Sequence, residues 1–174
     1  FLKRALLLFV LWEILYLTLL LPNRFVDKPL TNITASLTCK LLKVVYKKNV
    51  FTYGEESKQV WLEAYTTAYK TNIFMNTRKL IGIADGCNGF TLFILFLGFI
   101  IAYPSNDIKN KLLVSVSGIA IIFLANILRC FGLGLIQINI PSFTFFAHHY
   151  LFNIITYSIV FIFWAYYVKL VKNE

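Results

Sequence analysis

Residues 112–136 read LLVSVSGIAIIFLANILRCFGLGLI, and this stretch decides the class of fold. Its only charged side chain is Arg129. A helix needs about twenty predominantly apolar residues to cross a bilayer core of about 30 Å. In lipid, an open chain satisfies its backbone polar groups only as a helix. The stretch therefore predicts a membrane-spanning helix that carries an arginine.

Three further stretches are similarly apolar, namely residues 5–21, 86–103 and 148–170. The chain has 174 residues, of which 59% are hydrophobic, and its mean hydropathy is +0.70. A soluble domain cannot bury that much apolar surface. We therefore expect an all-α integral membrane protein in which residues 1–174 form a single domain with about four transmembrane helices, including residues 112–136.

The basic residues of the short loops predict the orientation. They precede the first span, lie between the second and third, and follow the fourth: Lys3, Arg4, Lys109, Lys111, Lys169 and Lys172. The linker 137–147 has no lysine or arginine. Since short cytoplasmic loops are enriched in these residues, we expect both termini in the cytoplasm. Residues 22–85 would then lie outside. Basic residues in so long a translocated segment have little influence on orientation.

The outer segment 22–85 begins with an amphipathic pattern. Apolar residues recur at helical spacing, with lysines on another side: Leu30, Ile33, Leu37, Leu41, Val44 and Val45 against Lys40, Lys43 and Lys47. This pattern predicts a helix lying in the membrane interface. A fifth helix buried in the bundle is the alternative interpretation.

The remainder of this segment predicts a small extracytoplasmic cap. Residues 50–53, 60–62 and 80–83 are short β-like runs, and residues 54–57 (Gly-Glu-Glu-Ser) interrupt them. Such runs are typical of a hairpin.

Charge and cysteine spacing exclude other classes. The net charge is +9, but basic flanks are ordinary in a membrane protein and no nucleic-acid-binding signature accompanies them. The cysteines Cys39, Cys87 and Cys130 show no CxxC or Cys/His zinc spacing. We expect membrane lipid around the protein, and no nucleic acid.

Three reactive groups lie at a similar expected depth. Helical rise separates Cys87 from Pro104 by about 25 Å, and Arg129 from Lys111 by about 27 Å. The same rise separates His149 from Lys169 by about 30 Å. All three groups are therefore expected near the outer membrane boundary, in one pocket built by three helices.

This combination suits cysteine chemistry. A thiol attacks only when ionised, and a helix capped by Asp85 or its neighbour would place Cys87 in the first turn, where the helix dipole favours the thiolate. Arg129 would favour the thiolate further or stabilise an oxyanion, and a histidine would move the proton. Asn126 lies one turn before Arg129 and is a candidate partner for it or for substrate.

The competing interpretation is a non-catalytic membrane assembly or transport subunit. In that case Arg129 would form a structural ion pair, although a charge within a span is a functional candidate by default. A transport pathway would distribute polar groups along the whole span, whereas here they cluster at one end.

The motifs Asp85-Gly-Cys87-Asn88-Gly and Asn126-x-x-Arg129, followed by a helix-opening histidine, resemble the exosortase/archaeosortase family. The short chain and the string HHYLFN at 148–153 look like its compact exosortase F type. Many relatives have more spans than this chain, so substrate-guiding parts are expected to be missing or supplied by a partner.

The resemblance implies a cysteine transpeptidase or peptidase of the bacterial inner (plasma) membrane, with its site on the outer face. Its expected substrates are exported proteins that end in a sorting signal: a short motif, a transmembrane helix and a basic tail. Cys87 would be the nucleophile, Arg129 the anion stabiliser and His149 the acid/base. His148, Asn126, Asn88 and Asp85 are possible accessory residues. The resemblance implies no metal or organic cofactor.

Overall fold

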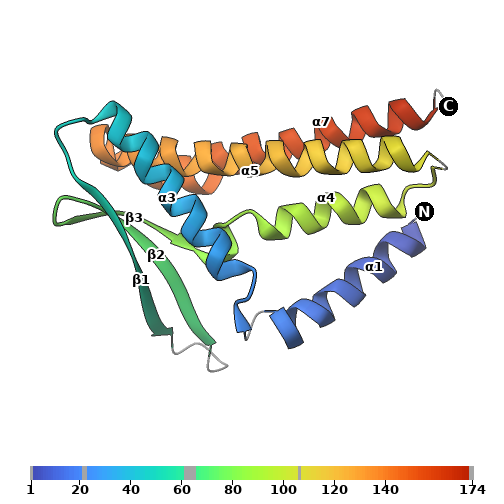
Figure 1. Ribbon diagram of the computed structural model, residues 1–174, viewed down its shortest axis with the longest axis horizontal. Helices are drawn as coiled ribbons and strands as arrows, with labels where there is room; N and C mark the ends of the chain where they lie inside the picture. The colour runs from blue at the N-terminus through green and yellow to red at the C-terminus, as the bar shows by residue number, and fades with distance from the viewer. Residues whose placement is uncertain (1, 21–22, 61–65, 106, 173–174) are drawn as a thin grey trace.

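The computed structural model describes residues 2–20, 23–60, 66–105 and 107–172. Most of the chain is helical, and a three-stranded sheet lies at the end opposite both chain termini (Figure 1). The elements before the sheet are α1 (Leu2–Leu15), η1 (Tyr16–Leu20) and α3 (Asp27–Val45). The strands are β1 (Phe51–Val60), β2 (Thr66–Met75) and β3 (Arg78–Ala84). After them come η2 (Asp85–Cys87), α4 (Phe90–Ala102), α5 (Ile108–Asn139), η3 (Pro141–Phe143), α6 (Thr144–Phe146), η4 (Ala147–Leu151) and α7 (Phe152–Lys172).

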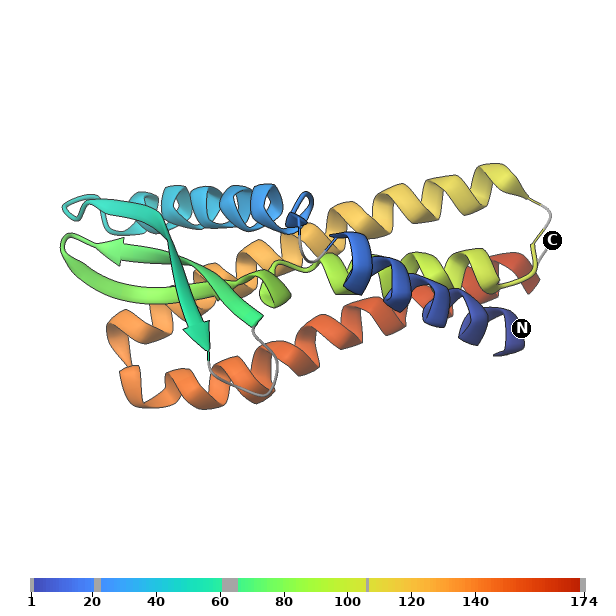
Figure 2. The same ribbon diagram turned by 90° about the horizontal axis from the view of Figure 1, so that it is seen from below.

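Helix α5 is the axis of the molecule. It begins where the Asp107 side chain accepts hydrogen bonds from the backbone N–H groups of Lys109 and Asn110, which satisfies donors that a helix start leaves free. Helices α3, α4 and α7 all contact it, with α4 beside its first half and α3 beside its second half (Figure 2). One apolar cluster joins α4, α5 and α7: Phe96, Ile100, Val114, Ile122, Val160 and Tyr167.

Among the described residues, two helical segments are long and apolar enough to cross a membrane. They are Ile108–Asn139 and Pro141–Lys172. The apolar helices Leu6–Leu15 and Phe90–Ala102 are shorter, so the predicted count of four spans is not confirmed. Helix α1 continues into the π-helical turn η1, and α4 ends at Ala102, before Pro104.

The close approach of α4 to α5 depends on Gly118. A Cβ atom at Gly118 would meet Cζ of Phe96 at 2.2 Å, whereas one at Gly98 on α4 would meet nothing within 4 Å. Both glycines lie in helices, so alanine gives each the same gain in helix propensity. We expect Gly118→Ala to lower the free energy of unfolding by about 1–3 kcal/mol relative to Gly98→Ala. Thermal unfolding in detergent measures this, and equal midpoints for the two variants would contradict the packing.

The sheet corrects the expectation of an all-α protein and enlarges the predicted hairpin. β1 pairs with β2 and β2 with β3, both antiparallel. The predicted strands 50–53 and 80–83 lie largely in β1 and β3, whereas residues 61 and 62 lie outside the described residues. The predicted interruption at 54–57 is wrong, because β1 continues through it. Gly54 pairs opposite Asn72 there as an ordinary strand residue.

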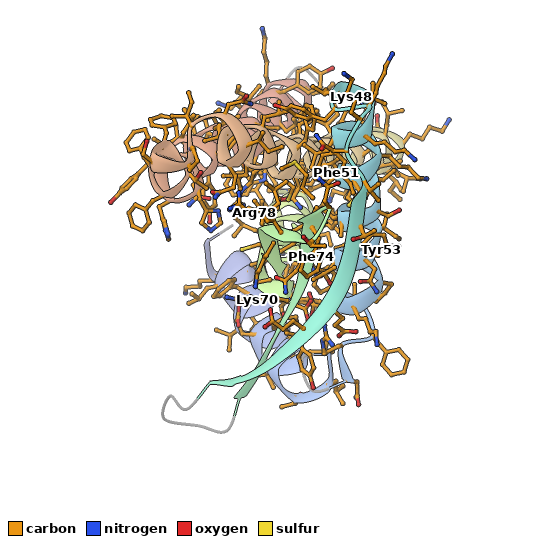
Figure 3. The ribbon with its side chains drawn as sticks, turned by 90° about the vertical axis from the view of Figure 1, so that its left-hand side faces the viewer. Lys48, Phe51, Tyr53, Lys70, Phe74 and Arg78 are labelled. Carbon is orange, nitrogen blue, oxygen red and sulfur yellow. The ribbon has the colours of Figure 1, made fainter. Side chains whose placement is uncertain are left out.

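Figure 3 looks at the sheet from its free end, with Phe51 and Tyr53 on β1, Lys70 and Phe74 on β2, and Arg78 at the start of β3. Under the sheet, Ile73 and Ile83 join a second apolar cluster with Ala35, Leu42 and Cys130.

Helix α3 forms where the amphipathic pattern predicts a helix, but its apolar stripe is not the side that packs. The buried side carries Asp27 and six mostly small residues, Thr31, Thr34, Ala35, Thr38, Cys39 and Leu42. Ile33, Val44 and Val45 are exposed instead. Burial raises the pKa of the Cys39 thiol to about 11, so this cysteine stays protonated and packs as a small apolar side chain.

Candidate active site

Cys87 ends η2, a 3₁₀ turn between β3 and α4, and is half-buried. The expectation that it lies in the first turn of α4 is therefore wrong. The helix starts at Phe90, because Gly89 adopts φ 92°, a left-handed conformation that glycine tolerates without strain. The Asn88 carbonyl oxygen (Oδ1) accepts a hydrogen bond of 2.8 Å from the Phe90 N–H. Asn88, and not Asp85, thus satisfies a free donor at the start of α4.

Asn88 also holds the turn in place through hydrogen bonds of its side chain. Its side chain is 1% exposed, and its Nδ2 donates to Oδ1 of Asp27 at 2.8 Å and to the Thr31 hydroxyl at 3.3 Å. Asp27 in turn accepts from the Tyr16 hydroxyl at 3.2 Å. Buried polar groups are stable only when they are paired. These hydrogen bonds therefore hold the η2 turn, which carries Cys87, against the start of α3.

Asp85 holds the other side of the same turn. Its Oδ2 accepts from Nε of Arg24 at 2.7 Å, and its Oδ1 accepts from the Thr31 hydroxyl at 2.9 Å. Arg24 also pairs with Glu55 of β1 and lies 3.6 Å from the centre of the Tyr69 ring of β2, a cation–π contact. Arg24 therefore ties the Cys87 turn to the sheet.

Sequence reasoning did not find Arg24, Thr31 or Asp27 as parts of the site. Arg24 lies 61 residues before Asp85 in the chain, and no local pattern connects them. The sequence feature that could have indicated this network is Asp27, a charged residue at the start of a helix whose buried side is rich in threonine.

The Arg24–Glu55 pair makes a pH-dependent contribution to stability. Hydrogen bonding to Arg24 lowers the pKa of Glu55, so the pair stabilises the fold above the unfolded pKa of about 4.3 and is lost as pH falls through the folded pKa. We expect Glu55→Gln to lower the thermal midpoint at pH 7. The corresponding loss in the free energy of unfolding should be less than about 1 kcal/mol, since the pair is partly exposed. The difference from the unsubstituted protein should shrink as pH falls through the lowered pKa of Glu55, and a difference that did not depend on pH would contradict this assignment.

Arg129 is delivered by the C-terminal half of α5 and is half-buried. No carboxylate lies within ion-pair distance of it in the part of the chain that the structure describes. Asn126, one turn earlier, is fully buried, and its Nδ2 donates to the backbone carbonyl of Cys87 at 3.3 Å. A Cβ atom at Gly89 would lie 3.4 Å from the Asn126 side chain. Asn126 thus supports the cysteine turn and does not pair with Arg129.

His148 and His149 lie in η4, a single π-helical turn, and such turns are frequent at functional sites. Their ring centres are 4.9 Å apart. His148 is half-buried, whereas His149 is exposed and its ring centre lies 4.4 Å from that of Phe145. The backbone carbonyl of His149 accepts from the Asn153 side chain at 2.9 Å.

Two cavities, of about 240 Å³ and about 280 Å³, share the same four reactive side chains, Cys87, Arg129, His148 and His149. The first lies toward the sheet and is otherwise bordered by β3, by α5 beyond Arg129 and by α6. The second lies toward α4 and α7, with Thr91, Asn153 and Thr156 on its walls. The expected convergence of thiol, guanidinium and imidazole into one place is thus present in the geometry.

Cys130 also lines the first cavity, but it is only 5% exposed. Among the described residues, no group of three or more histidine, cysteine or acidic side chains could hold a metal ion. Of the two thiols that line the first cavity, Cys87 is the more exposed.

These features define a helical membrane protein with a thiol, a guanidinium and two imidazoles gathered where its helices meet a small sheet. The sequence profile of the transmembrane exosortase family (Exosortase_EpsH) matches residues 1–166. The chain therefore belongs to the transmembrane exosortase family. No curated protein and no solved structure matches it. The compact F type stays a prediction.

Proposed function

We propose that this protein is a cysteine transpeptidase or peptidase embedded in the bacterial inner membrane, which cleaves the C-terminal sorting signal of exported proteins at the outer face. The observation that carries the proposal is the shared lining of two adjoining cavities by Cys87, Arg129 and both imidazoles. A nucleophile, an anion stabiliser and a proton carrier bordering one space are the parts that acyl transfer requires.

In the first half-reaction, the Cys87 thiolate attacks the carbonyl carbon of the scissile peptide bond. Arg129 donates hydrogen bonds to the oxyanion of the tetrahedral intermediate. His149 gives a proton to the leaving amine as the C–N bond breaks, which leaves a thioester on Cys87 and releases the C-terminal part of the signal. His148 is the reserve candidate for this role, because its ring borders the same two cavities.

In the second half-reaction, an amine or a water molecule attacks the thioester carbonyl. The histidine takes the proton of that nucleophile, and the thiolate leaves with its electron pair. The product is an amide in transfer and a carboxylic acid in hydrolysis, and Cys87 is regenerated. Asn126, Asn88 and Asp85 position the thiol before the reaction begins, because their hydrogen bonds fix the backbone that carries it.

Four crossings of the membrane fit this scheme. The α5 and α7 segments are long enough by themselves, and α1 with η1 covers residues 2–20, about 28 Å of helix. Helix α4 is the shortest, at about 20 Å, so the bilayer would thin around it or η2 would lie within the outer leaflet. Both termini would be cytoplasmic, and the sheet would lie outside.

A structural Arg129 in a non-catalytic subunit is the competing proposal. A structural role would give the guanidinium a carboxylate partner, because an unpaired charge near the membrane is costly. No such partner exists among the described residues, whereas Arg129 borders both cavities. These observations favour a site that meets a negative charge during a reaction.

A covalent adduct on Cys87 tests the proposal. The protein would be purified from cells that also express a tagged exported protein with such a signal, and digested for mass spectrometry. We expect the tagged fragment joined to Cys87 by a thioester, which neutral hydroxylamine would cleave. An adduct on Cys39 or Cys130 would count against Cys87 as the nucleophile. Processing of the tagged protein with no adduct detectable by mass spectrometry would also count against it.

A further inference from the structure

Strand β3 has one unpaired edge. The sheet order is β1-β2-β3, so β2 pairs with one side of β3. No other described strand pairs with its second side, and no backbone hydrogen bond joins described residues 78–84 to a described residue outside the sheet. Such an edge presents a row of free backbone N–H and C=O groups that another extended chain can pair with.

The first cavity runs along this edge. Leu80, Ile81, Gly82 and Ile83 all line it, and no described residue of β1 or β2 does. The cavity therefore lies on the side of β3 that faces away from β2. Across the cavity lie Leu133 and Gln137 of α5 and Thr144 of α6.

The cavity leads from the strand to the thiol. Cys87 is three residues beyond the end of β3 and lines the same cavity, together with Arg129. Ala84, the last strand residue, keeps an extended backbone with ψ 153°. A chain that pairs with β3 would therefore be directed at Cys87.

Two features indicate that this edge is left open for a polar, extended ligand. The Thr144 hydroxyl, on the opposite wall, is buried without a hydrogen-bond partner. The charges that usually protect an edge strand lie only at its far end, where Lys79 pairs with Glu56 at 2.9 Å. Residues 80–84, next to the site, carry no charge.

We propose that the segment of the substrate that precedes the scissile bond binds as an added strand on the free edge of β3. This inference rests on the proposed function and names how that substrate is held. Main-chain hydrogen bonds supply the binding, so substrates of different sequence are accepted, and side-chain preference comes from alternate positions. The strand of substrate ends at Cys87, where its carbonyl meets the thiolate.

Paired cysteines in membranes test the added strand. In the full-length Cys87→Ala variant, a single cysteine would replace Ile81 or Ala84, which lie in the regularly paired part of β3 and whose side chains therefore lie on opposite faces of the strand. Each protein would be co-expressed with the tagged exported protein used for the adduct, carrying one cysteine at successive positions before the cleavage site. Copper phenanthroline would then drive disulfide formation. The control is Cys87→Ala without a new cysteine, in which only the buried Cys39 and Cys130 remain.

We expect the Ile81 cysteine to crosslink at every second substrate position, and the Ala84 cysteine to crosslink at the intervening ones. The same crosslinks for both cysteines, or none, would overturn the added strand if the unsubstituted protein still processes the tagged protein. If the unsubstituted protein forms no adduct and does not process the tagged protein, the proposed function fails and the strand proposal fails with it.

Discussion

Cys87→Ala is expected to reduce processing of a tagged substrate by at least about a thousandfold, because removal of a catalytic nucleophile leaves only binding and oxyanion stabilisation. The variant should still insert and fold, since the Cys87 turn is held by its backbone carbonyl and by Asp85 and Asn88. The ratio of processed to unprocessed substrate in membranes measures the effect. Cys87→Ser is expected to be nearly as inactive, because a hydroxyl is a much weaker nucleophile at neutral pH.

Cys130→Ala is the matched control, because Cys130 lines the same cavity but is buried. It should retain processing, at the cost of a small cavity among its apolar neighbours. A Cys87→Ala variant that processes substrate normally would end the case for a cysteine enzyme, and loss of activity in Cys130→Ala alone would reassign the nucleophile.

Arg129→Gln is expected to lower the rate of processing by about a hundredfold to a thousandfold, the usual loss when a donor to an oxyanion is removed. Arg129→Lys should recover only part of the rate, since an ammonium group keeps the charge but not the fork of donors. Single-turnover rates of adduct formation on Cys87 separate this effect from substrate binding.

Stability distinguishes catalysis from structure at Arg129. We expect Arg129→Gln to leave the thermal midpoint unchanged or raised, because the guanidinium has no carboxylate partner among the described residues. Arg24→Gln is the contrast. It should lower the midpoint, because Arg24 pairs with both Asp85 and Glu55. Equal destabilisation by both variants would support the structural interpretation of Arg129.

The sequence predicts best those parts of the fold that a periodic or apolar pattern specifies. The long apolar run of α5 and the helical spacing of α3 both appear as helices. The side on which α3 packs was not predictable, because it contacts both α5 and the sheet, and small residues such as Thr31, Thr34 and Ala35 allow close approach. In a chain surrounded by lipid, apolar residues need not point inward.

The candidate site divides in the same way. Cys87, Arg129 and His149 could be found because each lies near the end of an apolar run, where helical rise alone predicts depth. The network of Arg24, Asp27 and Thr31 could not, because it joins residues about sixty positions apart through side-chain contacts. The position of Cys87 outside α4 depends on one backbone angle at Gly89, which a string of residue types does not encode directly.

The π-helical turn at Ala147–Leu151 holds one residue more than the α-helix that continues from it. Deleting a single residue there, such as Leu151, would let the helix wind regularly from α6 into α7. Every reactive group would survive, yet both imidazoles would swing by about 100° around the helix axis. One surplus residue thus sets the angle at which both imidazoles project, and losing it would turn them away from Cys87 and Arg129 although every reactive side chain is retained.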